Sequence, residues 1–388
     1  MNQIVTVNVS QQLASAPSKL QRTGALISRG ATENAVGSTY FLSSFADLAN
    51  IEFTEAPNYP ELLAMVTTFF AQNQSYSAFA GGTASATGGQ GVYVFEAGSS
   101  TTASEVAEVA AFIANPTVPV NASDSTPVPM YSWLTPFAWD QSADLNALCV
   151  TLDGTTQLSY FFISTTLPSG AGTGYEFWAG VKSQFIFVPT YVTTTPVIEF
   201  TTAAPFYVSL AYNPSPTNLV SPFEWHYLYG VTPLVLTNSQ ISALPAYVSF
   251  CGTGAEGGIS NTLLVGGNMG DSNPFNYWYS IDWVIINQSL ALSAAVINGS
   301  NRPTNPLYYN QAGINQLQKT SQAVMISAVA FGLVLAPVTV TAVPFNTYVA
   351  QNPGDYATGT YAGLACTFTP ARGFSAITIN LTATNIPA

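Results

Sequence analysis

The sequence has very little charge. Only 7% of its 388 residues are Asp, Glu, Lys or Arg, against about 25% in typical soluble proteins. Because a free monomer usually relies on surface charge for solubility, we infer that other subunits cover much of a surface made of Ser, Thr, Asn, Gln and aromatic residues. A secreted or cell-surface protein with a neutral, threonine-rich β surface is the alternative.

The few charges are unevenly distributed along the chain. Residues 1–30 carry three cations and no acid, residues 31–301 hold 18 of the 19 acids with only Lys182, and residues 302–388 have a small positive excess. Basic ends on an acidic body suit head-to-tail packing of copies, although both ends could instead fold onto their own body. Seven cations in all are too few for a phosphate-binding patch, so we expect no nucleic-acid partner.

Residues that build catalytic and metal sites are scarce. The three cysteines, Cys149, Cys251 and Cys366, are far apart and fit neither a metal spacing nor a disulfide framework, so we expect reduced, mostly buried thiols. A cross-link between subunits is the alternative. The single histidine, His226, lies in FEWHYLYG. Its aromatic neighbours favour a packed or hydrogen-bonded role, and no second histidine exists for a common metal site. Since no G-x-S-x-G stretch is present either, the sequence predicts a protein that is not an enzyme and has no catalytic residue and no metal site.

Two patterns could carry chemistry, and a structural role explains each better. Asp140 and Asp144 could form a carboxylate pair, but acids at a helix N-terminus are the simpler interpretation. Gly252, Gly254 and Gly257 spell G-x-G-x-x-G after the predicted strand AYVSF. A dinucleotide site needs a helix next, whereas GISNTLLVGG predicts loop and strand. We therefore expect no cofactor; an enzyme that uses this loop would be stabilised by its cofactor.

Neither a signal peptide nor a membrane span is expected. The N-terminus, MNQIVTVNVS, alternates instead of forming an apolar block. The uncharged stretch 320–354 is interrupted by Ser327, Gly332 and Pro337, and its VTVTAV segment alternates. A helix followed by a strand explains this stretch better than insertion into a membrane.

Strands and helices alternate in the middle of the chain. Alternation of this kind predicts an α/β layered sheet. We expect strands at 24–28, 92–97, 128–134, 158–164, 231–237 and 246–250, helices at 44–49, 59–71, 104–114 and 142–150, and a β-rich region at 185–210.

A pair of apolar helices is predicted within residues 274–332. The first begins after Ser280 as N-cap, has Asp282 in its first turn and ends at Asn298 and Gly299. The second begins near Asn310 and is followed by a strand at 333–343 and a loop at 350–363. Its packing seam has 3-4 spacing and consists of Ile314, Leu317, Ser321, Val324, Ala328 and Phe331.

Both chain ends read as amphipathic strands on polar tethers. An isolated terminal strand exposes unpaired backbone groups and must pair either within its own chain or with a neighbour. Pairing within the chain is the commoner outcome in general. The strand residues are Ile4, Val5, Thr6, Val7, Asn8 and Val9 at one end and Ile377, Thr378, Ile379, Asn380 and Leu381 at the other.

Several long stretches of the sequence resemble those of a known protein family. The stretches NYWYSIDW, AVINGSNRPTNPLYYNQAGI, YLYGVTP and GTGAEGGISNT are similar to those of the tail-sheath proteins of contractile bacteriophages, in particular the compact sheath proteins of some myophages. The resemblance covers most of the chain. It implies an α/β (α+β), multi-domain fold with a helix pair, a mixed sheet and extended terminal β arms.

The resemblance also implies a domain plan and a function. Residues 1–20 would form an N-terminal arm, 21–80 with 246–375 an inner core domain, 81–245 a middle or outer α/β domain, and 376–388 a C-terminal arm strand. The protein would be a structural subunit of stacked, six-membered rings around a tail tube. Contraction into a better-packed state would drive the tube through the host envelope for genome ejection, without a nucleotide.

The resemblance implies that residues 4–9 and 377–381 exchange strands between copies of the chain and so weave the subunits together. The other implied partners are the tail tube protein and baseplate and tail terminator proteins. The implied location is the virion, after assembly in the host bacterial cytoplasm. Gln311, Gln318 and Lys319, which lie off the seam of the second helix, are the expected tube-facing residues. The alternative is a receptor-binding or surface-layer protein whose neutral, aromatic surface binds carbohydrate.

Overall fold

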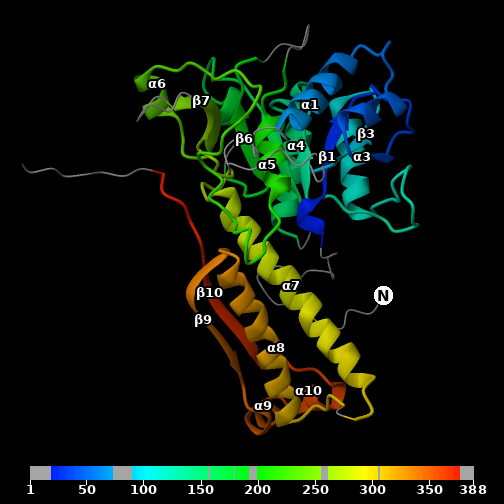
Figure 1. Cartoon of the computed structure of the whole chain (residues 1–388), viewed down its shortest axis with the longest axis vertical. Coiled ribbons are helices and arrows are strands. Elements are labelled where there is room, and N and C mark those ends of the chain that lie inside the picture. The colour runs from blue at the N-terminus through cyan, green and yellow to red at the C-terminus, as the bar shows by residue number, and fades with distance from the viewer. Residues whose placement is uncertain are drawn as a thin grey trace, which may run out of the picture.

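The protein consists of a large body and a smaller lobe that projects from it (Figure 1). This architecture is seen in a computed structural model that describes residues 19–72, 90–155, 158–178, 180–191, 199–254, 261–304 and 306–375. The long helix α7 (Phe275–Ser300) begins in the body and runs into the lobe. The position of the lobe therefore depends on how α7 sits in the body.

The body is built on an eight-stranded mixed sheet with strand order β2-β3-β1-β4-β5-β6-β7-β8. The six inner strands are parallel, and the two edge strands are antiparallel to their neighbours. Parallel strands covered on both faces have near-continuous apolar sequences, and every residue of GALIS and QFIFV is buried. The strands are β1 (Gly24–Ser28), β2 (Thr39–Leu42), β3 (Val92–Glu96), β4 (Ser132–Leu134), β5 (Tyr160–Ser164), β6 (Gln184–Val188), β7 (Val248–Gly254) and β8 (Asn261–Val265).

Helices cover both faces of this sheet. One face packs against α1 (Tyr59–Ala71), α5 (Ala203–Ala211) and the first half of α7, and the other against α3 (Thr102–Ala114) and α4 (Ala143–Asp153). Successive strand residues point to opposite faces, so Phe162 joins the first core and Phe161 the second. The predicted α/β fold with a mixed sheet is therefore confirmed. Shorter elements are α6 (Asn238–Ala243) and the 3-10 turns η1 (Leu20–Arg22), η2 (Phe45–Asn50), η4 (Phe137–Trp139) and η5 (Gly174–Phe177).

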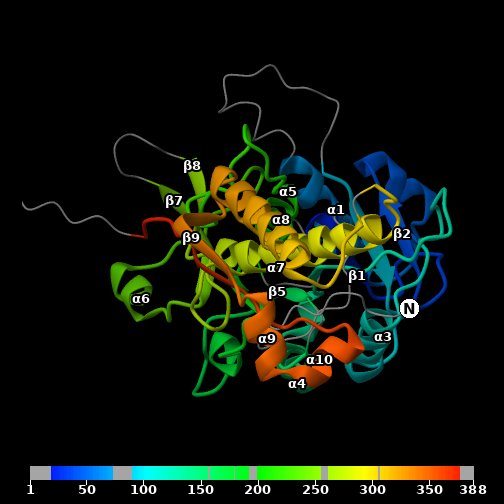
Figure 2. The ribbon, with the colours of Figure 1, turned by 90° about the horizontal axis from the view of Figure 1, so that it is seen from below.

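The lobe comprises the second half of α7 with α8 (Gln311–Ala330) and a two-stranded antiparallel sheet. Helix α8 lies between α7 and this hairpin, which is formed by β9 (Val334–Ala342) and β10 (Leu364–Pro370) (Figures 1 and 2). Two short helices, α9 (Phe345–Gln351) and α10 (Pro353–Thr358), connect the strands at the tip. The hairpin packs one face on the core through Val338, Val340, Leu364, Cys366 and Phe368.

The start of α7 differs from the prediction. Pro274, with extended backbone, stands at the N-cap, and Ser280 lies inside the helix, where its Oγ donates to the Asn276 carbonyl at 2.7 Å. Asp282 is consequently more than a turn inside the helix and buried. The start of α8 is as predicted. Asn310 is the N-cap, and its side chain accepts a hydrogen bond from the Gly313 N–H.

Several other segments differ from the prediction, among them residues 44–49, where the expected helix is the 3-10 turn η2. Residues 231–237 form no strand, residues 203–211 form α5 inside the expected β-rich region, and α9 and α10 occupy the expected loop at 350–363. Helix α5 has eight of its nine residues buried, so its helical period is hidden in a continuous apolar run. The terminal strands at 4–9 and 377–381 lie outside the described residues.

The predicted boundary between inner and outer domains does not follow the sheet. Strands β1, β2, β7 and β8 would belong to the inner domain and β3 to β6 to the outer one. However, β1 pairs with both β3 and β4, and β6 pairs with β7. Residues 24–265 therefore contribute to one sheet, and the structurally separate part is the lobe.

Helix α7 is the one candidate membrane span among the described residues, by length and composition alone. Of its most apolar window, 44% is buried inside the molecule. Core helices of this length and composition satisfy the same criterion, and α7 contributes Phe275, Tyr279, Val284 and Ile286 to the core that it shares with the sheet.

Candidate functional site

The carboxyl edge of the parallel sheet is the first place to look for a ligand site. In open α/β sheets, ligands bind where the strand order reverses. Here this point lies between β1 and β4. Strand β3 lies beside β1 on one side, and the next strand of this parallel series along the chain, β4, lies beside β1 on the other side.

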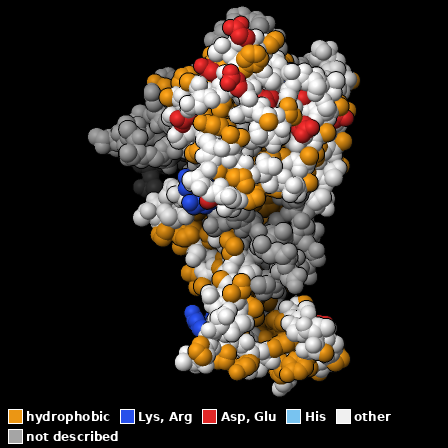
Figure 3. Space-filling view, turned by 90° about the vertical axis from the view of Figure 1, so that its right-hand side faces the viewer, with side chains coloured by type: hydrophobic (Ala, Val, Ile, Leu, Met, Phe, Trp, Pro, Cys, Tyr) orange, Lys and Arg blue, Asp and Glu red, His pale blue; other side chains and the backbone are white. Residues whose placement is uncertain are grey.

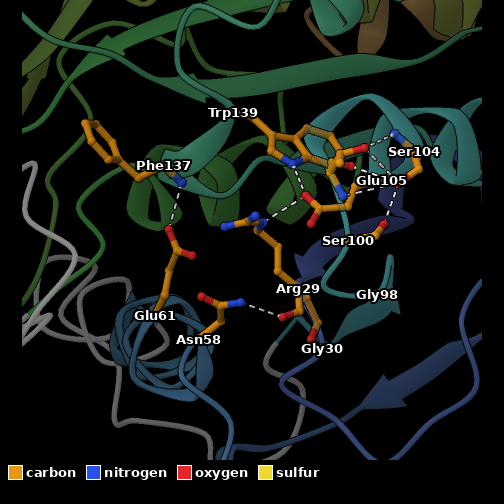
Figure 4. Close-up of polar contacts among 12 residues, drawn as sticks. Arg29, Gly30, Asn58, Glu61, Gly98, Ser100, Ser104, Glu105, Phe137 and Trp139 are labelled. Atoms are coloured by element: carbon orange, nitrogen blue, oxygen red, sulfur yellow. Dashed lines mark hydrogen bonds and ion pairs between the residues drawn. The ribbon is translucent and has the colours of Figure 1, made fainter.

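The chain's own side chains fill this position (Figure 4). Arg29 follows β1, and its Nε donates to Glu105 Oε2 of α3 at 2.8 Å. The Trp139 indole N–H donates to the same oxygen at 2.7 Å. From α1, Glu61 accepts a hydrogen bond from the Phe137 N–H at 2.7 Å, and burial raises the pKa of Glu61.

Arg29 and Trp139 both donate to Glu105 Oε2, whereas Glu105 Oε1 is buried without a hydrogen-bond partner among the described residues. One arginine lies between two glutamates, and the Asn58 amide donates to the Arg29 carbonyl at 2.8 Å. Within the described ranges, no group of three His, Cys, Asp or Glu side chains could hold a metal ion. The contacts therefore link α1, α3 and the loop after β4.

Glu96, at the end of β3, has a similar structural role. Its carboxylate is buried and accepts from the Ser28 hydroxyl, the Gly30 and Gly98 N–H groups, and both the hydroxyl and the N–H of Thr32. Hydrogen bonds to a charged acceptor are the stronger ones. This carboxylate fixes the loop after β1 to the end of β3.

The other candidate residues are also engaged in packing. His226 is half-buried with its Nε2 3.0 Å from Ser221 Oγ, and burial lowers its pKa to about 4, so it is neutral at pH 7. Burial raises the pKa of Cys149 and of Cys251 to about 12. Cys366 is half-buried, and burial raises its thiol pKa as well. The packing of His226 and the burial of Cys149 and Cys251 agree with the predictions.

The remaining patterns also have defined places. Asp144 lies in the first turn of α4, as predicted, and Asp140 accepts a long contact of 3.4 Å from the Trp178 indole. Gly252 and Gly254 belong to β7 itself, and Gly257 lies outside the described residues. The two described glycines thus belong to a strand of the main sheet.

Both edges of the main sheet are covered by the chain itself. Along β2, the Val120 N–H donates to the Thr39 carbonyl, and the Asn121 amide both donates to and accepts from the Phe41 backbone. Along β8, residues 225–228 exchange backbone hydrogen bonds with Thr262 and Leu264. Covered edges of this kind prevent pairing with other chains.

The hairpin of the lobe has open edges instead. Among the described residues, β9 and β10 pair only with each other, and no backbone–backbone hydrogen bond joins the outer edge of either strand to a third segment. The one described side-chain contact to the β9 backbone at such a position is from Gln318 of α8, which donates to the Val340 carbonyl at 3.0 Å. An isolated two-stranded sheet is marginally stable in water, and open edges are templates for further strands. The hairpin is therefore the candidate assembly site.

The lobe surface carries little charge and exposes apolar and threonine side chains, as expected of a surface that another subunit covers. Residues 311–370 contain only two charged side chains, Lys319 and Asp355. The outward face of the hairpin carries Leu335, 54% exposed, and four exposed threonines, Thr339, Thr341, Thr367 and Thr369. In Figure 3, acidic side chains gather on the body, whereas the lobe shows mainly apolar and uncharged ones.

Tyrosines cluster at the tip of the lobe. The Tyr309 ring lies 5.8 Å from Phe345 and 5.4 Å from Tyr356, and the Tyr348 and Tyr361 rings are 4.8 Å apart. Tyr356 is 51% exposed and the neighbouring Tyr308 is 65% exposed. The tip is thus an aromatic surface with little charge.

The three residues expected to face a tube have different surroundings. Gln311 accepts from the Phe345 N–H at 2.8 Å, and Gln318 donates to the Val340 carbonyl at 3.0 Å. The two glutamines therefore hold α9 and β9 onto α8. Lys319 is exposed.

Strand β10 was not predicted, although its sequence carries a signal. In LACTFTP, the half-buried residues Leu364, Cys366 and Phe368 alternate with the exposed residues Ala365 and Thr367, which is the pattern of a half-buried strand.

The fold is that of a contractile sheath protein. No protein-family model matches the sequence, and no curated protein sequence matches it significantly. The chain is similar to a solved structure of the helical sheath of the anti-feeding prophage in its contracted state (TM-score 0.60, 13% identity, 99% of this chain and 100% of that one). It is also similar to a chain of the contracted anti-feeding prophage baseplate (TM-score 0.57, 13% identity, 97% of each chain).

A weaker similarity is to the sheath tail protein from Listeria innocua (TM-score 0.45, 8% identity, 84% of this chain and 91% of that one). The sheath fold inferred from the sequence resemblance is confirmed by the similarity to the helical sheath.

Proposed function

We propose that the protein is a structural subunit of a contractile tail sheath, which polymerises around a tail tube and contracts to drive that tube through a host envelope. The observation that carries this proposal is the uncharged hairpin of the lobe, whose two outer edges have no backbone partner among the described residues, while both edges of the main sheet are covered. Similarity to a helical sheath over 99% of the chain supports it.

The terminal strands are the proposed occupants of the open edges. Residues 4–9 and 377–381 of neighbouring copies would add to β9 and β10 by β-augmentation, in which main-chain hydrogen bonds supply affinity. A tether of about ten residues can span about 35 Å when extended. Such tethers would keep subunits linked while their bodies rotate past one another.

The assembly itself follows from contacts of the head-to-tail type. Heterologous contacts of this kind generate rings or open helices, and six subunits per ring, stacked helically, is the proposed arrangement. A more complete packing between subunits in the contracted state would supply the energy, without a nucleotide. The proposed location is the tail of a virion assembled in a bacterial cytoplasm, without nucleic-acid binding or membrane insertion, and the proposed further partners are baseplate and tail terminator proteins.

The lobe is also the proposed site for the tail tube. The expected tube-facing group of Gln311, Gln318 and Lys319 lies on α8. Because the two glutamines already make hydrogen bonds within the lobe, Lys319 is the member of this group with a free role in such a contact. We therefore place the charged part of the tube contact at Lys319.

The aromatic tip favours a second candidate function. Tyr308 and Tyr356 are exposed, and exposed aromatic rings are suited to stacking on sugar rings. A receptor-binding or surface-layer protein would use this surface to bind carbohydrate. An independent module of this kind would not need a terminal strand from another copy of the chain to pair with the edges of the hairpin.

Negative-stain electron microscopy of the purified full chain tests the proposal. Hollow tubes or stacked rings are the expected result, either for the protein alone or after co-expression with its tail tube protein. Discrete small particles under both conditions would contradict a sheath. Binding to a glycan array, abolished by Tyr308→Ala with Val235→Ala as an exposed control elsewhere, would then favour the second candidate.

A further inference from the structure

A single buried carboxylate joins α7 to the central sheet. Asp282 of α7 is 3% exposed, and its Oδ2 accepts hydrogen bonds from the hydroxyls of Tyr131 and Tyr160, both at 2.7 Å. Tyr131 directly precedes β4, and Tyr160 begins β5. The contact therefore ties the helix to two adjacent strands through one oxygen atom.

Helix α7 is also the main support of the lobe (Figure 1). Few polar contacts otherwise join the two parts. The Val220 N–H donates to the Phe331 carbonyl at 3.0 Å, and the Asn276 amide donates to the Ala371 carbonyl at 3.1 Å. Beyond β10, Arg372 donates to the Asn273 side chain, and the Trp225 indole donates to the Phe374 carbonyl at 3.1 Å. How firmly the first half of α7 is seated on the sheet consequently decides how firmly the lobe is held.

The carboxylate has no cation bound to it. Neither ion pair between described residues involves Asp282, and Lys182, which acts on it from a distance, lies over the Trp278 ring and near Asp153. The titratable and charged groups around it, directly or through the two tyrosines, are Tyr131, Tyr160, Tyr279, Lys182, Asp271 and Arg22.

Burial determines the protonation of this cluster. It raises the pKa of Asp282 to about 6, against the opposing effects of the two tyrosine hydroxyls and of Lys182. Burial likewise raises the pKa of Tyr131 and of Tyr160, so both remain neutral donors throughout the range in which Asp282 titrates.

We propose that Asp282 is a titratable latch, which holds α7 and hence the lobe to the body more firmly in mild acid than at neutral pH. A protonated carboxyl group avoids the penalty for a buried charge, and its carbonyl oxygen still accepts from the tyrosines. When α7 leaves the sheet, Asp282 meets water and its pKa returns to its usual value. The seated state thus binds the proton more tightly than the open state.

The sign of the pH dependence follows from this difference. The added stability of the seated helix is complete below the usual pKa of an aspartate, near 3.9, and is lost as pH rises through about 6. This inference concerns the single chain and does not depend on the proposed function.

Hydrogen exchange followed by mass spectrometry on the full chain tests the latch. After correction for intrinsic exchange rates, protection of residues 279–290 should fall about 20-fold from pH 4.5 to pH 7. In Asp282→Asn this change should disappear. Asp144→Asn, an exposed aspartate on α4, is the matched control and should behave as the wild type.

A second variant keeps the test decisive if Asp282→Asn does not fold. Tyr160→Phe retains the carboxylate but removes one of its donors, so the midpoint of the protection change should move to higher pH. Equal protection of wild-type α7 at both pH values would overturn the proposal. So would an unchanged pH dependence in Asp282→Asn, or an unmoved midpoint in Tyr160→Phe.

Discussion

At the scale of single residues, the buried charges of the body have structural partners. Glu96 shows this most clearly, because its carboxylate receives five hydrogen bonds from residues 28–32 and Gly98. All five groups are donors that point at the two carboxylate oxygens. In a glutamine, an NH2 group would replace one of these oxygens and would face donors instead of accepting from them.

We therefore expect Glu96→Gln to lower the free energy of unfolding by about 2–4 kcal/mol. Urea unfolding followed by circular dichroism measures this change. Glu108→Gln is the matched control, because Glu108 is exposed on α3 and its substitution should change stability by less than about 0.5 kcal/mol. Equal effects of the two substitutions would show that the hydrogen bonds to Glu96 do not stabilise the fold.

His226 makes the body sensitive to acid in the opposite direction to Asp282. Burial lowers the pKa of His226 to about 4, so at pH 5 the unfolded chain binds a proton that the folded chain does not. Its contribution to stability is present above the usual pKa of histidine, near 6.5, and is lost as pH falls toward 4.

The expected result is that wild-type protein loses about 1–2 kcal/mol more stability than His226→Gln between pH 7 and pH 5. Urea unfolding at the two pH values provides the comparison, and only the difference between pH values counts, since the substitution also changes packing. If both proteins showed the same pH dependence, His226 would be protonated in the folded state.

At the scale of elements, the sequence predicted those helices and strands in which apolar and polar residues alternate with a recognisable helical or strand period, or whose ends carry clear signals. Helix α1 has the predicted limits, with Pro60 in its first turn and Glu61 beside it, and β1 coincides with GALIS. Helix α5 was missed because it is apolar all round, so that neither period stands out. The start of α7 was misplaced because Ser280 is a good N-cap residue, yet the apolar pattern continues upstream of it.

Close packing at the start of α8 gives a prediction at this scale. Gly313 lies in the first turn of α8, and an added Cβ would stand 2.0 Å from the Tyr308 carbonyl oxygen. The connection from α7 would have to move away from the helix. We expect Gly313→Ala to destabilise the lobe by about 2–3 kcal/mol, seen as faster hydrogen exchange in α8 and in the hairpin.

Gly354→Ala is the matched control within the same lobe. Gly354 lies in α10 with no heavy atom within 4 Å of an added Cβ, so this substitution should be neutral or stabilise by up to about 1 kcal/mol. Exchange rates in α8 that rise equally in both variants would refute the close contact at Gly313.

At the scale of the whole molecule, the sequence predicted two strands in need of a partner but not the surface that receives them. The hairpin pairs β9 with β10 across the α9–α10 insertion, with Thr339 opposite Thr367. No local pattern indicates such a pairing. The low charge did indicate a covered surface, and the structure concentrates this property in the lobe.

Assembly through the N-terminal strand gives the last prediction. If residues 4–9 add to an open edge of a neighbouring hairpin, each N–H that faces the hairpin takes part in a ladder. Proline has no N–H and fixes its own backbone angle, so it is excluded from the middle of a sheet. Val7→Pro should therefore abolish tubes in electron microscopy, while the circular dichroism and unfolding of the single chain stay unchanged.

Val7→Ile is the control, because it keeps the donor and the preference for a strand, and it should form tubes as the wild type does. Replacing residues 10–18 by a Gly/Ser linker of equal length should also preserve tubes, since a tether needs only its reach. Tubes formed by Val7→Pro at wild-type yield would show that the N-terminal strand does not join the subunits. Loss of tubes in the linker variant alone would instead assign the contact to the tether.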